Sequence, residues 1–252
     1  MKKNKPCLLK AGLFIIGILL LASCGIYDYP YIYPVPEGNI ILRVTNTFVS
    51  INTGNDNADN PYFTHFIIFY RIYISDVDTP VTGSADTITM SRINNSMGSH
   101  HASINNISGS QSIGGAAAYD LITRSLRFRE LALDNNNIDA ILSNSAIGSI
   151  IEINFGHGTA PPYLSIGGAN YTLIRQHLST SSEERFFRNN IDGLMRDINN
   201  IDGDNRDVTN NTSTTKSHSH ALMYIMAAGI NTQNFAPIYS SPTFLGVLLL
   251  PD

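Results

Sequence analysis

Two histidines in the C-terminal third of the chain are the residues best spaced to bind a transition metal. His218 and His220 occupy alternate positions, so on a strand they would share one face, which suits a pair of imidazole ligands. A third ligand would have to come from a distant part of the chain, from His157, His100 or His101. Because His218 and His220 end a Ser/Thr-rich loop, we expect both to be exposed and replaceable. We therefore predict no metal and no cofactor.

Three aspartates alternate in the segment IDGDNRD and are spaced like the acidic ligands of a calcium loop: Asp202, Asp204 and Asp207. Arg206 falls at the next ligand-spaced position, and no glutamate follows near the end of the loop. The segment does not fit an EF-hand, and a looser calcium site is the alternative.

Residue types suited to nucleophilic catalysis are present without the spacing that catalysis needs. No serine lies in a G-x-S-x-G elbow, and Ser165 in YLSIGG lacks the flanking residues that build one. A pair of carboxylates for glycoside hydrolysis could come only from residues far apart in the sequence. The sequence nominates no catalytic residue, so we predict a protein that is not an enzyme, with a hydrolase as the least favoured alternative.

The first residues have the composition of a secretory leader. Three lysines give a positive start, and an apolar run from Leu13 to Ala22 follows, which is too short to span a bilayer comfortably. The last two residues of the run are Leu21 and Ala22, and Ser23 and Cys24 follow them directly.

This arrangement resembles the lipobox of bacterial lipoproteins, with Leu21, Ala22 and Ser23 before the modified Cys24. The resemblance covers only the leader. It implies cleavage before Cys24, acylation of that cysteine with fatty acids such as palmitate, and a lipid-anchored place in the bacterial cell envelope. Since Gly25 is not the aspartate that retains some lipoproteins at the inner membrane, the resemblance favours the outer membrane. An uncleaved membrane helix is the alternative.

The charge that remains after such cleavage limits the possible partners. Removal of residues 1–23 leaves 252 − 23 = 229 residues, with 12 basic and 20 acidic side chains and a net charge of −8. Lys216 is the one lysine left, and the arginines are scattered, so no basic stripe is available for a phosphate backbone. We predict that nucleic acid is not a partner and that the acyl chains supply the membrane attachment.

Residues 24–38 are predicted to form a tether, because three prolines force extended backbone. Tyrosines alternate through it, and we interpret it as a spacer whose rings lie against the domain. An interfacial aromatic belt, or a strand that pairs with a partner, is the alternative. A single domain is expected over residues 39–252.

Alternating and β-branched patterns predict a mainly β, sandwich-like domain of about eight strands with one or two peripheral helices. The predicted strands are 39–52, 63–75, 121–133, 147–155, the hairpin 163–166 with 171–174, 221–230 and 239–250. Helices are predicted within 86–106 and 181–198, and a mobile loop over 199–220. The last strand is expected inside a sheet, under the second helix. The phrase FYRIYIS resembles sheet-forming segments of immunoglobulin-like and fibronectin type III modules, which implies a similar architecture.

From these patterns we expect a lipid-anchored cell-envelope protein with a non-catalytic binding or structural role. Its partners would be the membrane, through the N-terminal lipid, and an unidentified protein or glycan. A solute- or glycan-binding lipoprotein is the alternative, because the aromatic residues could line a concave site.

Overall fold

The computed structural model describes residues 30–42, 48–77, 87–108, 115–156, 161–175, 187, 207–209 and 218–251. The part of the chain from Tyr31 onwards forms one compact unit. The predicted leader lies outside the described residues, and so does the predicted helix 181–198 apart from Phe187.

Two long antiparallel strands form the centre of the unit, β3 (Phe63–Ser75) and β10 (His218–Ile230). Both are rich in β-branched and aromatic residues, and nearly every side chain of both is buried, as expected of strands covered on two faces. Smaller strands extend this sheet: β4 (Arg129–Glu130), β9 (Val208–Thr209), β11 (Pro237–Tyr239) and β12 (Thr243–Leu249). The prediction of a central strand at 63–75 is confirmed.

A second sheet is antiparallel and runs in the order β1-β2-β6-β7-β8-β5. Its strands are β1 (Ile40–Leu42), β2 (Phe48–Asn52), β5 (Ala132–Leu133), β6 (Ile150–Asn154), β7 (Tyr163–Ile166) and β8 (Ala169–Ile174). Gly167 and Gly168 join β7 to β8 with φ angles of 58° and 83°, and a two-residue hairpin turn with two positive φ angles favours glycine. The predicted hairpin is therefore confirmed, with a tighter turn than expected.

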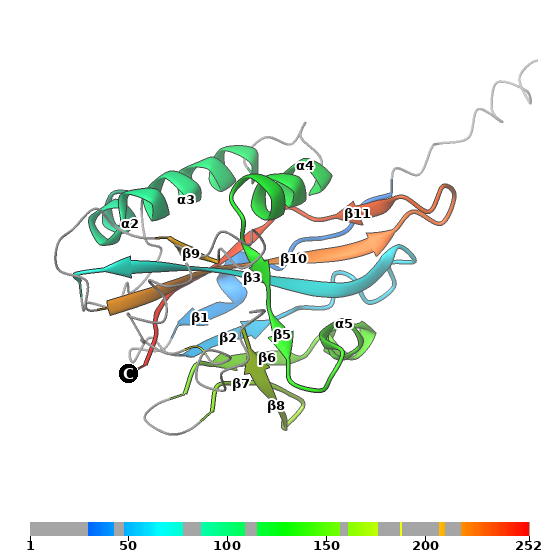
Figure 1. Cartoon of the computed structure of the whole chain (residues 1–252). Coiled ribbons are helices and arrows are strands. Elements are labelled where there is room, and N and C mark those ends of the chain that lie inside the picture. The colour runs from blue at the N-terminus through cyan, green and yellow to red at the C-terminus, as the bar shows by residue number, and fades with distance from the viewer. Residues whose placement is uncertain are drawn as a thin grey trace, which may run out of the picture. The chain divides into compact units, whose positions relative to one another are not determined.

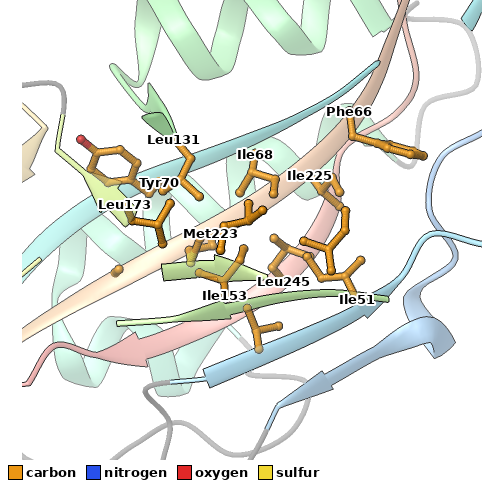
Figure 2. Packing of buried hydrophobic residues seen from close by; sticks show 14 of the residues in the cluster. Ile51, Phe66, Ile68, Tyr70, Leu131, Ile153, Leu173, Met223, Ile225 and Leu245 are labelled. Carbon is orange, nitrogen blue, oxygen red and sulfur yellow. The ribbon is translucent and has the colours of Figure 1, made fainter. Parts of the chain in front are cut away.

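The two sheets pack face to face over an apolar core. Side chains at alternate positions of β3 and β10, such as Ile68, Tyr70 and Met223, meet Ile51 and Ile153 of the second sheet (Figure 2). Phe187 also lies in this core, with its ring centroid 4.9 Å from that of Tyr70. The mainly β, sandwich-like fold predicted from the sequence is confirmed.

Helices cover the opposite face of the β3–β10 sheet (Figure 1). They are α2 (Thr87–Ile93), α3 (Asn95–Ser108), α4 (Gly115–Asp120) and a π-helical turn η2 (Leu121–Ser125). A short α5 (Ile138–Ile141), with the 3-10 turns η1 (Glu37–Asn39) and η3 (Asn144–Ala146), completes the described helices. None of the helices in the described ranges is long and apolar enough to cross a membrane.

The predicted helix over 86–106 is confirmed, with a break at Asn94. Its apolar stripe is buried on the sheet: Met90, Ile93, Met97, His101 and Ile104. Asn94 interrupts the helix because its side chain is used elsewhere, donating to the carbonyl of Ile74 at 3.0 Å and accepting from the amide of Ser96 at 2.9 Å.

Three predicted elements differ from the structure. The predicted strand 39–52 is a hairpin, β1 with β2. Most of the predicted strand 121–133 is wrong, because 121–125 form the π-helical turn and only short β4 and β5 follow. The predicted loop 199–220 is wrong at most of its described residues, since 208–209 belong to β9 and 218–220 belong to β10.

The C-terminal strand β12 is buried on both faces, as predicted. Leu245 and Leu248 point into the core between the sheets, while Val247 and Phe244 pack on the helix side. The prediction that it lies inside the sheet is wrong: within the described residues its ladder is with β10 alone, beside β11 on the same edge. Phe244 lies 4.9 Å, centroid to centroid, from His101 of α3, so α3 contributes to the helix-side cover of this strand.

Residues 31–36 of the predicted tether are packed on the domain. Ile32 and Val35 are buried in the core between the sheets, whereas Tyr31 and Tyr33 are about half exposed. A Cβ atom at Gly229 would lie 1.9 Å from the carbonyl oxygen of Tyr62 and 2.4 Å from the Cδ1 atom of Ile32, so the close approach of the Tyr62 backbone requires glycine here. This part of the predicted tether therefore belongs to the compact unit.

Candidate functional site

The polar residues that the fold brings together lie on the helix face of the central sheet. Tyr73 of β3 and Tyr224 of β10 point toward α3, which carries the adjacent His100 and His101. His220 of β10 is the direct cross-strand partner of Tyr73. We call these five residues the tyrosine–histidine cluster.

Two short hydrogen bonds join α3 to the sheet within this cluster. The Tyr73 Oη and His100 Nδ1 atoms are 2.6 Å apart, and the Tyr224 Oη and His101 Nδ1 atoms are also 2.6 Å apart. The Nε2 atom of His101 lies 2.8 Å from the side-chain nitrogen of Asn105, one turn further along α3. Adjacent histidines of one helix thus each contact a different central strand.

Burial determines the protonation states in the cluster. It raises the pKa of Tyr73, an effect that the nearby Arg71 guanidinium partly opposes, and it raises the pKa of Tyr224. Burial, followed by the charge of Arg71, lowers the pKa of His100 to about 4, and burial lowers the pKa of His101. At neutral pH both tyrosine hydroxyls are therefore protonated and both imidazoles are neutral, and the imidazole tautomer decides which partner donates in each hydrogen bond.

Arg71 places a positive charge beside the cluster, in the middle of an otherwise apolar strand. Its side chain is 8% exposed, and it donates from Nε to the Thr209 hydroxyl at 2.7 Å and from Nη1 to the Arg127 carbonyl at 2.8 Å. Burial lowers the pKa of Arg71, while electrostatic interactions with Tyr73 and Asp207 act in the opposite direction. Arg71 thereby fixes β9 and the chain after η2 against β3.

The two histidines predicted as metal candidates share one face of β10, as the spacing predicted. The prediction that both are exposed is wrong. His220 is completely buried between β3 and β12, paired across to Tyr73 and Leu249, and His218 is half-buried. In the part of the chain that the structure describes, no group of three or more His, Cys, Asp or Glu side chains is arranged to hold a metal. His157 lies outside that part.

A second buried polar contact joins the two sheets. Arg175, directly after β8, donates from Nε and Nη2 to the two carboxylate oxygens of Asp207, at 3.1 and 2.7 Å. The side chains are 4% and 1% exposed, and the carbonyl of Asp207 accepts a hydrogen bond from the amide of Ile72. Asp207 was one of the three calcium candidates; its carboxylate is engaged by Arg175, and Asp202 and Asp204 lie outside the described residues.

The sequence offered partial signals for these residues. Arg71 interrupts the apolar phrase FYRIYIS, and His101 lies on the apolar stripe of the predicted helix, so both were placed to be buried. Cys24, with Leu21, Ala22 and Ser23, lies outside the described residues. Comparison of the chain with protein-family models, with curated proteins and with solved structures gives no match.

The contacts of the tyrosine–histidine cluster and of the Arg175–Asp207 ion pair join the layers of the domain. The two hydrogen bonds between tyrosine and histidine connect α3 to the central strands, and the Arg175–Asp207 ion pair connects the two sheets. The arrangement holds the layers in register.

Proposed function

We propose that this chain is a lipid-anchored protein of the bacterial cell envelope whose domain has a non-catalytic binding or structural role. The observation that carries the proposal is the coincidence, in one leader, of a lysine-rich start, an apolar run and the ending Leu21-Ala22-Ser23-Cys24. Acylation of Cys24 would attach the mature chain to a membrane through its N-terminus. The glycine at position 25 favours the outer membrane.

Support for a binding or structural role comes from the way the domain uses its reactive side chains. The two histidines of α3 hydrogen-bond to buried tyrosines, and Asp207 is held by Arg175. Such contacts stabilise a rigid scaffold, and rigid β scaffolds are suited to presenting a surface to a partner. The unidentified protein or glycan partner would bind on the outside of this scaffold.

The chain provides a matched pair of variants for testing the anchor, because its two cysteines differ in their predicted roles. Cys24→Ser should abolish incorporation of labelled fatty acid and release the protein from the membrane fraction. Cys7→Ser removes the other cysteine, which would leave with the leader, and should change neither property. Membrane attachment and acylation that persist in Cys24→Ser would overturn the proposal.

The destination is tested separately by separation of inner and outer membranes on a density gradient. The parent protein should be recovered with the outer membrane. Gly25→Asp should move it to the inner membrane if the retention rule implied by the lipobox resemblance applies here. Recovery of the parent protein in the inner membrane would contradict the proposed destination while leaving the anchor intact.

A further inference from the structure

Exposed apolar side chains gather at one end of the compact unit. Among the described residues, seven large hydrophobic side chains are exposed, and four of them belong to two neighbouring segments: Tyr31 (56%), Tyr33 (48%), Ile230 (45%) and Phe235 (80%). We call these four residues the aromatic tip. Their exposure has no explanation in the packing of the domain itself, so they point to an external contact.

Hydrogen bonds connect the two segments that form the aromatic tip. The side-chain amide of Asn60 donates to the carbonyl of Tyr31 at 2.7 Å, and its oxygen accepts from the amide of Tyr62 at 3.0 Å. The carbonyl of Tyr62 in turn accepts from the amide of Ile230 at 2.9 Å. The N-terminal segment and the end of β10 are therefore held at the same place, where Figure 1 shows the hairpin from β10 to β11.

Phe235 occupies an unusual backbone position in that hairpin. Its φ angle is 58°, in the left-handed region that aromatic residues seldom adopt, and its amide donates to the carbonyl of Asn231 at 2.8 Å. The side chain is nevertheless the most exposed large hydrophobic group among the described residues. Holding a phenylalanine in a strained turn and in water is unfavourable for the isolated domain, so a contact outside the domain is the better explanation.

The chain length between the predicted anchor and this end limits what the aromatic tip can face. Six residues separate Cys24 from Tyr31. At a maximum of about 3.5 Å per residue, they place Tyr31 within roughly 25 Å of an acylated Cys24. This step rests on the proposed function, because only an acylated Cys24 would fix the chain to a bilayer.

We propose that the aromatic tip docks onto the bilayer that holds the acyl chains, inserting Phe235 and the tyrosine rings at the level of the headgroups. Tyrosine is favoured at such interfaces because its ring is apolar and its hydroxyl is polar. Docking would fix the orientation of the domain, with the hairpin from β10 to β11 toward the membrane.

The charges beside the aromatic tip indicate which lipid headgroups it can contact. Asp56 and Asp59 are exposed on either side of Asn57, whose side chain hydrogen-bonds to both the amide and the carbonyl of Tyr33. Two carboxylates near the contact disfavour anionic headgroups. The surface that fits is therefore zwitterionic, and apolar insertion supplies the attraction.

Tryptophan fluorescence can test this docking because the chain contains no tryptophan. The probe is Phe235→Trp in the full, acylated chain, reconstituted into phosphatidylcholine vesicles with and without brominated acyl chains. The matched control is Ile88→Trp, because Ile88 is also exposed, at 65%, and lies on α2, away from the hairpin between β10 and β11 in Figure 1. Mass spectrometry of each preparation establishes that Cys24 is acylated.

The emission of Phe235→Trp should shift to shorter wavelength on reconstitution and lose intensity in brominated vesicles, while Ile88→Trp shows neither change. An acylated Phe235→Trp protein without shift or quenching would overturn the docking and leave the proposed anchor standing. A shift without quenching by brominated lipid would instead indicate contact with a second copy of the chain and would also overturn it. A chain that is not acylated would contradict the proposed function itself.

Discussion

Removal of one partner of the Arg175–Asp207 ion pair should be among the most destabilising single changes in the domain. In Arg175→Met the methionine keeps much of the apolar stem but leaves the Asp207 carboxylate, which is 1% exposed, without its bidentate donor. Breaking a buried pair in this way costs about 3–5 kcal/mol of unfolding free energy. For a domain of this size that is a fall in Tm of roughly 6–20 °C.

The matched control is the exposed pair of Asp120 and Arg124 on α4 and η2, whose side chains are 54% and 81% exposed. Arg124→Met should change the unfolding free energy by less than about 0.5 kcal/mol. Urea unfolding, followed by circular dichroism in chains that carry Cys24→Ser so that lipid does not interfere, measures both.

A double variant separates the ion pair from simple loss of packing. Arg175→Met with Asp207→Leu replaces both charges by apolar groups, and should recover most of the stability lost in Arg175→Met. The reasoning is refuted if Arg175→Met costs no more than Arg124→Met, or if the double variant loses the sum of the two single changes.

Three further expectations concern the helix face and the last strand. Because the pKa of His100 is lowered to about 4 in the folded chain, the unfolded chain binds the proton first as the pH falls. The unfolding free energy should therefore be constant above about pH 6.5 and fall by on the order of 1–2 kcal/mol toward pH 4, a value discounted for the partial exposure of His100. Urea midpoints that are flat over this range, or the same fall in a His100→Gln chain, would contradict this expectation. His220→Ala should cost about 1–3 kcal/mol because the imidazole is completely buried, and His218→Ala less than about 1 kcal/mol, so equal effects in thermal unfolding would be unexpected. Leu248→Ala should cost about 2–5 kcal/mol, since it opens a cavity in the core between the sheets, and a soluble chain with an unchanged Tm would show that β12 is peripheral.

The central strands could be predicted because their local pattern and their final environment agree. The segment 63–75 is apolar on both parities, and only a strand with both faces covered can bury such a sequence. The stripe through Met90, Met97 and His101 was equally informative, because a 3.6-residue period fits one face of a helix.

Other elements could not be predicted because tertiary contacts override their local pattern. The segment LITRSLRFRE alternates like a strand, yet its first residues turn in a π-helix, with the amide of Leu126 donating to the carbonyl of Leu121. His220 follows a polar stretch, and its burial is decided by β3 and β12 on either side of it. Arg175 and Asp207 are 32 positions apart in the sequence, so no local sequence pattern could predict that they form an ion pair.

The sequence predicts which residues of the N-terminal segment are buried only when the correct backbone conformation, strand or polyproline, is assumed. Tyrosines at alternate positions suggest a strand-like period of two. Prolines favour a polyproline conformation with three residues per turn, which places Ile32 and Val35 on the same side. These two residues are the buried ones, and Tyr31 and Tyr33 are left exposed.

The central claim, that the chain is anchored by lipid at Cys24, is tested most directly by mass spectrometry of the protein purified from membranes. The mature chain should begin at Cys24, and its N-terminal peptide should carry the added mass of a diacylglyceryl group and its fatty acids. An N-terminal peptide that retains residues 1–23, or an unmodified Cys24 in the membrane-bound protein, would contradict it.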